Sequence, residues 1–148
     1  MVAEGPKLAH QQQWVKKPAN GHPGTITLNL KSTPTLCLTE LPSCPHASSG
    51  CLQLQTCNGG ASQLFTIKTV KGGFELLNNG KCLDIYSNGK VDGSPIDVWG
   101  CDSPQEDNQR WTWDEQTSTI ASFEVIQKHL PFVITVCTKG KLGNETGY

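Results

Sequence analysis

Short runs of alternating and β-branched residues, separated by turn residues, make up most of the chain. Such runs occur at Thr25–Leu28, Phe74–Leu77 and Phe123–Ile126, with Gly, Pro and Asn-Gly pairs between them. No segment has the apolar spacing of a convincing helix. The pattern therefore predicts an all-β barrel or sandwich built from short strands.

A Gln-x-aromatic triplet occurs three times, and a short β-prone segment follows each copy. The triplets are Gln12-Gln13-Trp14, Gln63-Leu64-Phe65 and Gln109-Arg110-Trp111. Trp14 stands 51 residues before Phe65, which stands 46 residues before Trp111. Units that recur at this period indicate a repeat architecture. We expect the three aromatic residues to pack in a shared core and the glutamines to satisfy buried backbone groups.

The third interval closes only when the two ends of the chain are combined. Tyr148 lies 37 residues after Trp111, and the 14 residues up to Trp14 complete an interval of 51. We therefore expect one domain over residues 1–148, with repeats at about 25–70, 71–119, and 120–148 joined to 1–24. Neighbouring terminal strands would close the barrel and remove an exposed sheet edge. The alternative is a fragment of a longer protein with both ends incomplete.

Composition favours a single small domain that binds neither nucleic acid nor membranes. The chain has 148 residues, of which 36% are hydrophobic, and this is enough for one modest core. Its net charge is −1, and the 12 basic residues form no stripe that would neutralise a phosphate backbone. The longest apolar stretch, residues 130–137, is far shorter than the roughly 20 residues of a membrane span.

The chain contains seven cysteines, and none of them form a Cys-x-x-Cys pair: Cys37, Cys44, Cys51, Cys57, Cys82, Cys101 and Cys137. Zinc-ribbon and thioredoxin patterns are therefore absent, and disulfides in a secreted, extracellular protein are favoured. The sequon Asn144-Glu145-Thr146 fits a secreted glycoprotein. A zinc site made of Cys44, Cys51, Cys57 and His46 is the alternative, although the usual ligand spacing is missing. We expect no cofactor and no metal.

The second repeat carries three further motifs: Cys82-Leu83-Asp84, Trp99 two residues before Cys101, and Asn108-Gln109-x-Trp111. Over about residues 72–120 they resemble the ricin-type (ricin B-type) lectin family, and the resemblance is weaker over 25–70. It implies a β-trefoil of three QxW-type repeats, in which Cys82 pairs with Cys101. It also implies that Asp84, Trp99 and Asn108 hold a hexose, with a galactose-like sugar favoured.

The chemistry of these side chains suits a pyranose, which has a face of C–H groups and a rim of hydroxyls. Trp99 offers an aromatic plate for the face, Asp84 accepts two hydroxyl hydrogens, and the Asn108 amide donates. Gln109 supports the site from beside Asn108. Asp97 stands two residues before Trp99 on a strand, so it points to the same side, where we expect it to contact or orient the ligand. The family often has Gln at this position.

Equivalent positions in a repeat should take equivalent bridges, so we expect Cys37 to pair with Cys57. Cys44 and Cys51 would then close a small extra loop and leave Cys137 free.

The other two repeats lack the sugar-binding residue types. Counted from the cysteines, Thr39 takes the place of Asp84 and Gln55 that of Trp99 in the first repeat. In the split repeat, Lys139 and Val2 occupy the two positions. We therefore expect one shallow pocket and a monovalent protein.

These features predict a carbohydrate-binding lectin module that is not an enzyme. The module is either free-standing or the targeting module of an attached glycoside hydrolase. The alternative is a trefoil that acts as a protein-interaction or protease-inhibitor domain. A glycosidase couple of Asp84 and Asp97 is disfavoured, because nothing in the sequence marks either carboxyl as buried or its pKa as raised. Gly-x-Ser-x-Gly and His-Glu-x-x-His motifs are absent as well.

Overall fold

A computed structural model describes residues 2–4, 13–42, 51–85, 96–104, 107–123 and 133–135. The described elements are β-strands and two single 3-10 turns. The strands are β1 (Val2–Glu4), β2 (Trp14–Pro18), β3 (Thr25–Leu30), β4 (Thr33–Leu41), β5 (Cys51–Thr56), β6 (Phe65–Val70), β7 (Gly73–Asn78), β8 (Lys81–Ile85), β9 (Ile96–Trp99), β10 (Trp111–Asp114), β11 (Thr119–Ser122) and β12 (Val133–Thr135). The 3-10 turns are η2 (Ala61–Gln63) and η4 (Asp107–Gln109). The all-β prediction is confirmed.

Each aromatic residue of the Gln-x-aromatic triplets opens a strand, as the repeat predicts. Trp14 begins β2, Phe65 begins β6 and Trp111 begins β10. The expected strands at Thr25–Leu28 and Phe74–Leu77 lie within β3 and β7. The strand expected at 123–126 is wrong at its first residue, because β11 ends at Ser122, and residues 124–126 lie outside the described part of the chain.

Glycines allow a tight turn after β7 and a close contact with β10 at its start. The Asn79-Gly80 turn between β7 and β8 places both residues at positive φ, 49° and 77°, and this geometry favours the Asn-Gly pair that the sequence has there. At the start of β7, a Cβ on Gly73 would collide with the carbonyl oxygen of Trp111. Glycine therefore permits the contact of β7 with β10, where Phe74 pairs with Trp111.

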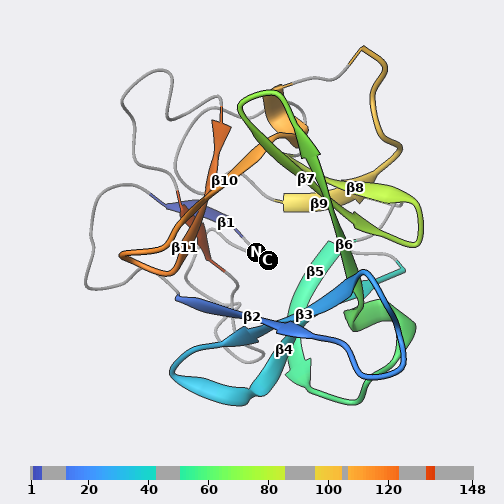
Figure 1. Cartoon of the computed structure of the whole chain (residues 1–148), viewed down its shortest axis with the longest axis vertical. Coiled ribbons are helices and arrows are strands. Elements are labelled where there is room, and N and C mark those ends of the chain that lie inside the picture. The colour runs from blue at the N-terminus through green and yellow to red at the C-terminus, as the bar shows by residue number, and fades with distance from the viewer. Residues whose placement is uncertain are drawn as a thin grey trace, which may run out of the picture.

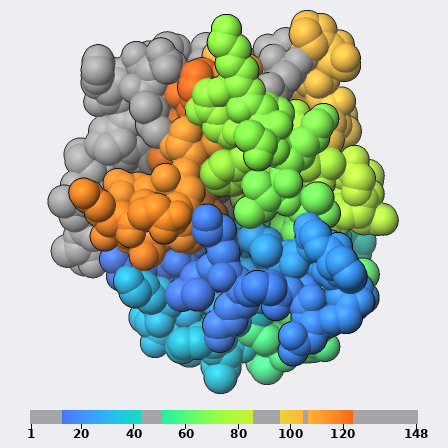
Figure 2. Space-filling model, viewed as in Figure 1, coloured from blue at the N-terminus to red at the C-terminus, as the bar shows by residue number. Residues whose placement is uncertain are grey.

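Strand pairings close the sheet into a barrel. They run from β7 through β6, β3, β4, β5, β9 and β8, and β8 pairs with β7 again. Figure 1 shows the strands in three groups around the middle of the view: β2–β4 at the bottom, β7–β9 at the upper right, and β10, β11 and β1 on the left. On the face shown in Figure 2, the N-terminal strands in blue adjoin both the orange and the green segments.

The core is formed by the repeated aromatic residues and by aliphatic side chains from all three groups. Trp14, Phe65 and Trp111 are each buried, which confirms their predicted packing role. The other members of the core cluster are Leu28, Leu30, Leu38, Leu52, Leu54, Leu76, Leu83, Ile85, Ile96, Val98 and Ile120. Within the described part of the chain, these side chains form one hydrophobic core cluster.

Two disulfides occupy equivalent places in the β4–β5 and β8–β9 strand pairs. Each joins one strand to the segment just after its partner strand. They are Cys37–Cys57 and Cys82–Cys101, at sequence separations of 20 and 19, and both match the expected pairing. Because Cys57 belongs to a disulfide, it cannot serve in the alternative zinc site. Cys44 and Cys137 lie outside the described residues, so the Cys44–Cys51 bridge stays a prediction.

The N-terminal segment packs against the C-terminal half of the chain. β1 pairs antiparallel with β12, with Val2 opposite Thr135 and Glu4 opposite Val133. The backbone N–H of Trp14 donates to the carbonyl of Ser118 over 2.8 Å. These contacts fit a repeat shared between the two termini, whose boundaries stay a prediction. Gln12 and the sequon at 144–146 lie outside the described residues.

Within the described part of the chain, no helix has the length and apolarity needed to cross a bilayer.

Candidate functional site

The paired strands β8 and β9 carry three of the five expected site residues, Asp84, Asp97 and Trp99. Their register places Cys82 opposite Trp99, Leu83 opposite Val98 and Asp84 opposite Asp97. Because side chains alternate along a strand, the Cys82–Trp99 and Asp84–Asp97 pairs share one face of the strand pair. Leu83 and Val98 belong to the core cluster on the other face. The disulfide from Cys82 to Cys101, two residues after Trp99, holds this register in place.

The Asp84 carboxylate is held by two amide groups from η4. Asn108 Nδ2 lies 3.2 Å from both Oδ1 and Oδ2 of Asp84. Gln109 Nε2 donates to Oδ2 over 2.7 Å. The structure therefore brings together three of the five predicted site residues, Asp84, Asn108 and Gln109, in one hydrogen-bonded group.

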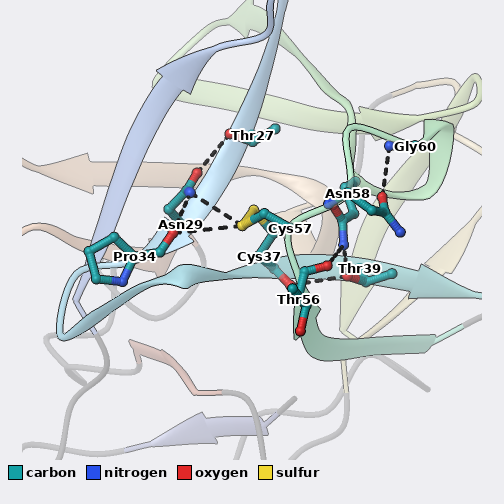
Figure 3. The surroundings of a disulfide bond; sticks show 10 residues. Thr27, Asn29, Pro34, Cys37, Thr39, Thr56, Cys57, Asn58 and Gly60 are labelled. Atoms are coloured by element: carbon teal, nitrogen blue, oxygen red, sulfur yellow. Dashed lines mark hydrogen bonds between the residues drawn. A yellow bond between two sulfur atoms is a disulfide. The ribbon is translucent and has the colours of Figure 1, made fainter.

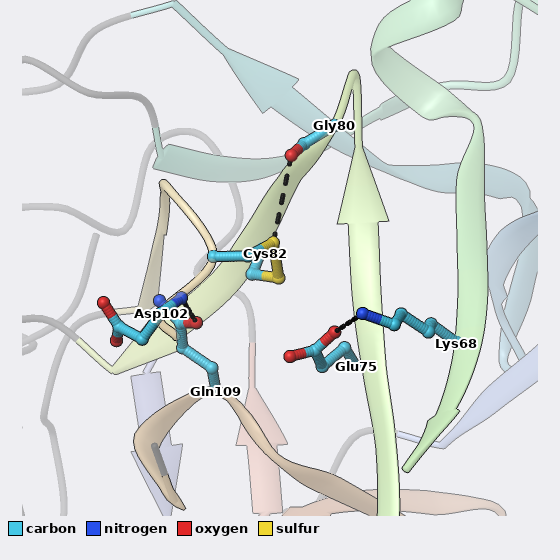
Figure 4. A network of polar contacts seen from close by, with 7 residues as sticks. Lys68, Glu75, Gly80, Cys82, Asp102 and Gln109 are labelled. Atoms are coloured by element: carbon cyan, nitrogen blue, oxygen red, sulfur yellow. Dashed lines mark hydrogen bonds and ion pairs between the residues drawn. A yellow bond between two sulfur atoms is a disulfide. The ribbon is translucent and has the colours of Figure 1, made fainter. Parts of the chain in front are cut away.

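Gln109 also forms hydrogen bonds with the backbone of the segment that follows β9. Its Nε2 donates to the carbonyl of Gly100 over 2.9 Å, and its Oε1 accepts from the backbone N–H of Asp102 over 2.8 Å. Figure 4 shows this contact with Asp102 close to the disulfide of Cys82. Gln109 is fully buried, so it satisfies backbone groups, as expected, and at the same time orients Asp84.

The two tryptophans of this repeat have different surroundings. Trp99, at the end of β9, is 52% exposed and is the exposed large hydrophobic residue among those that the structure describes. Trp111 is buried, and its indole Nε1 donates to the carbonyl of Leu83 over 3.3 Å. A flat apolar ring is thus available to a ligand at Trp99 and is used for packing at Trp111.

Asp97 lies beside Asp84 but is less accessible. It is 2% exposed and Asp84 is 7% exposed. Of the two expected roles for Asp97, direct contact with a ligand and orientation of the site, its burial favours the second. Oδ1 of Asp97 has no hydrogen-bond partner within the described ranges.

Both carboxyl groups have pKa values well above the ordinary aspartate value of 3.8. The pKa of Asp84 is raised to about 6, mainly by burial and also by the Asp102 charge, while the hydrogen bonds from the amides of Gln109 and Asn108 lower it. Burial also raises the pKa of Asp97 to about 7, with a second contribution from the Asp84 charge. The sequence disfavours a glycosidase couple because nothing in it marks either carboxyl as buried or its pKa as raised, and the burial of both residues removes that ground. The cause is tertiary packing around β8 and β9, of which the residue pattern carries no sign.

The first repeat contains the same framework with neutral residues. Its register places Thr39 opposite Gln53 and Cys37 opposite Gln55, so Thr39 and Gln55 occupy the positions of Asp84 and Trp99. Gln63 Nε2 donates to Thr39 Oγ1 over 3.0 Å and to the carbonyl of Thr56 over 3.0 Å. Figure 3 shows Thr39 and Thr56 beside the disulfide of Cys37 and Cys57. The framework recurs here without a carboxylate or an aromatic plate.

In the split repeat, Val2 lies in β1, and Lys139 lies outside the described residues.

Sequence reasoning missed three features of the site. These are the Gly100 carbonyl, the Asp102 backbone N–H, and the direct opposition of Asp84 and Asp97. The cysteines offered a signal for the last one. With Cys82 joined to Cys101 and Trp99 opposite Cys82, two steps along each antiparallel strand lead to Asp84 and Asp97.

Comparison with known proteins gives one family and two similar structures. A family model described as the ricin-type beta-trefoil lectin domain matches residues 24–141. No curated protein matches the chain at a significant level. A crystal structure of a designed 3-fold symmetric protein, ThreeFoil, is similar with a TM-score of 0.55 and 20% identity, covering 67% of this chain and 69% of that chain. A mosquitocidal holotoxin is similar with a TM-score of 0.56 and 23% identity. The match covers 67% of this chain but 12% of the toxin chain. Together the family model and these structures agree with the predicted β-trefoil fold.

Proposed function

The chain belongs to the ricin-type β-trefoil lectin family, and we propose that it binds a hexose at one site in its second repeat, formed by Asp84, Trp99 and Asn108. A galactose-like sugar is favoured. Carbohydrate binding in general follows from the family, whereas the place of the site and the kind of sugar are our proposal.

One observation carries the proposal: an oriented carboxylate and an exposed aromatic ring share one face of the β8–β9 strand pair. Asp84 is fixed by the amides of Asn108 and Gln109, and Trp99 lies at the end of the neighbouring strand with half of its surface exposed. A sugar ring stacked on Trp99 would have its hydroxyl rim near Asp84. Because charge-assisted hydrogen bonds are stronger than neutral ones, a pre-oriented carboxylate is a suitable acceptor for two neighbouring hydroxyls.

Asn108 completes the recognition of the hydroxyl rim. Its amide is partly accessible and already donates to Asp84. An amide offers both donors and an acceptor, so it can hydrogen-bond the same hydroxyl that Asp84 accepts from. Gln109 is buried and supports Asp84 without contacting the sugar.

We infer a single site because the first repeat has Thr39 and Gln55 at the two decisive positions. Neither a hydroxyl nor an aliphatic amide replaces the charge of Asp84 or the ring of Trp99. The protein would therefore act as a monovalent module, either free-standing or attached to a glycoside hydrolase. The two disulfides fit a secreted protein.

The raised pKa values of Asp84 and Asp97 give a reason to weigh a glycosidase as a second function. A retaining glycosidase needs two carboxyls about 5 to 5.5 Å apart, both reaching the scissile bond. Asp97 is 2% exposed, and Asp84 is held by two amides, so the pair offers no second carboxyl to a substrate. We therefore propose binding without catalysis. Release of free sugar from a bound glycan would contradict this.

The test is a glycan array followed by calorimetric titration of the best ligand. Asp84→Ala and Trp99→Ala are expected to abolish measurable binding. The matched controls are Thr39→Ala and Gln55→Ala, which change the equivalent positions of the first repeat and should leave binding intact. Undiminished binding by Asp84→Ala would place the site in another part of the molecule. An array without any signal would favour the alternative of a protein-interaction or inhibitor domain.

A further inference from the structure

Two buried aspartates face each other directly across β8 and β9. Asp84 and Asp97 are partners in the antiparallel register, and such partners have Cβ atoms about 4.5 to 5.5 Å apart. The equivalent pair in the first repeat is Thr39 and Gln53, which carries no charge. The charged pair is therefore specific to the repeat that contains the proposed sugar site.

Hydrogen bonds distinguish the two carboxyls. Both oxygens of Asp84 accept from amide N–H donors, an arrangement that suits an ionised carboxylate. Oδ1 of Asp97 has no partner among the residues that the structure describes. A backbone hydrogen bond favours the charged form of Asp97, but less than burial and the charge of Asp84 disfavour it. A single proton on the pair therefore belongs on Asp97.

We propose that Asp97 is a positioning residue of the sugar site: in slightly acidic solution it carries the one proton of the Asp84–Asp97 pair, leaves the one negative charge of the pair on Asp84, and thereby confines strong sugar binding to a limited pH range. This inference rests on the proposed function of Asp84. It adds a pH dependence that the neutral pair of the first repeat would not provide.

The surroundings contain no described cation that would offset a second charge on Asp97. Asp97 is paired with Asp84 on β8 and with Cys51 on β5. Asp102 adds negative charge near Asp84 from the segment after β9. In the segment at η4, Arg110 pairs with Asp107 at 3.4 Å. In line with the hydrogen bonds, the pKa of Asp97 is about 7 and that of Asp84 about 6.

Two protonation steps bound the pH range. Below about pH 6, Asp84 takes up a proton and loses its capacity as a double acceptor, so affinity falls by about tenfold per pH unit. Above about pH 7, Asp97 loses its proton and two buried charges lie side by side. A sugar on Trp99 removes water from this pair and opposes the second charge, so affinity falls again. The profile is bell-shaped, with its maximum between these two values.

The experiment measures affinity for the best array ligand from about pH 4.5 to 9 in the wild type, Asp97→Asn and Asp102→Asn. Asparagine keeps the shape of a protonated Asp97 but cannot ionise. We expect Asp97→Asn to lose the alkaline decrease and keep the acid decrease. Asp102→Asn, which removes the negative charge that raises the pKa of Asp84, should keep the alkaline decrease and move the acid decrease to lower pH. An alkaline decrease that persists in Asp97→Asn would overturn the inference.

A second measurement does not depend on sugar binding. Carboxyl carbon NMR of the free protein follows the ionisation of Asp84 and Asp97 separately, with Asp97→Asn identifying the signals. We expect Asp97 to ionise after Asp84, and both above the ordinary aspartate range. An Asp97 that ionises in the ordinary range would overturn the inference and leave the proposed function standing. Absence of glycan binding at every pH would instead overturn the proposed function.

Discussion

Gln109 donates a hydrogen bond from Nε2 to Oδ2 of Asp84 over 2.7 Å, and this contact connects the carboxylate of Asp84 to the backbone that Gln109 holds. The same side chain holds Gly100 and Asp102. In the first repeat, Gln63 makes the equivalent contact with Thr39 over 3.0 Å. The same glutamine contact thus occurs in both repeats, and only in the second repeat does the glutamine bond to a charged side chain.

Gln109→Ala and Gln63→Ala are therefore expected to differ in binding but not in stability. Each leaves buried backbone groups without partners, so each should lower the free energy of unfolding by about 1 to 3 kcal/mol. Only Gln109→Ala releases Asp84 and should weaken glycan binding. Denaturant unfolding and calorimetric titration of both variants check this. Equal loss of affinity in the two would contradict a role for Gln109 in orienting Asp84.

The two raised pKa values predict how stability depends on pH. Folded Asp84 and Asp97 have pKa values of about 6 and about 7, and the ordinary value is 3.8. Between about pH 4 and 7 the folded state therefore holds more protons than the unfolded state, so these groups lower the free energy of unfolding as pH rises. The stability of the double variant with Asn at both positions, relative to the wild type, should rise from pH 4 to pH 8 by more than about 1.4 kcal/mol, the equivalent of one pKa unit. Equal differences at the two pH values would show that neither carboxyl is shifted.

Trp111→Ala and Trp99→Ala separate the core from the proposed site. Trp111 is buried in the shared core, so its truncation should lower the free energy of unfolding by about 3 to 5 kcal/mol. Trp99 is 52% exposed, so its truncation should change stability by about 0.5 kcal/mol or less and abolish glycan binding. Thermal unfolding and titration of both variants distinguish the roles. A large loss of stability in Trp99→Ala would assign this residue to packing.

Deletion of residues 1–14 should unfold the domain, because Trp14 is buried in the core and its backbone bonds to Ser118. Deletion of residues 1–12 is the matched control, since it removes β1 but keeps Trp14. It should lower the melting temperature and retain a cooperative transition. A chain that keeps its melting temperature without residues 1–14 would show that the N-terminal segment does not complete a repeat.

A single shallow site should bind weakly and fail to cross-link cells. One aromatic plate and a few hydrogen bonds correspond to a Kd of roughly 0.1 to 1 mM, or about −4 to −5.5 kcal/mol. Agglutination requires linked sites, so a tandem fusion of two copies should gain avidity and agglutinate cells where the monomer does not. Cross-linking by a monodisperse monomer would indicate a second sugar site elsewhere in the molecule.

The sequence by itself determined the repeat, the core aromatics and two disulfide pairs. The aromatic residue of each Gln-x-aromatic triplet opens a strand, the family resemblance implies the Cys82–Cys101 pair, and the cysteines at equivalent positions in the first repeat pair in the same way. The resemblance to the ricin-type lectin family, together with the chemistry of the side chains, identified Asp84, Trp99, Asn108 and Gln109 as a candidate group. The strand that the β-prone run predicts at 123–126 is wrong at Phe123, because such a run does not reveal where a neighbouring strand stops pairing.

Only the tertiary structure decided what surrounds the carboxyl of Asp97. Alternation along a strand puts Asp97 on the same side as Trp99, and from this the sequence predicts similar access to a ligand. In the folded chain Trp99 ends β9 and is exposed, whereas Asp97 is enclosed between β8 and β5, opposite Asp84 and Cys51. Burial, and with it the raised pKa of both aspartates, depends on strands that are distant in sequence, so the chain pattern alone could not give it.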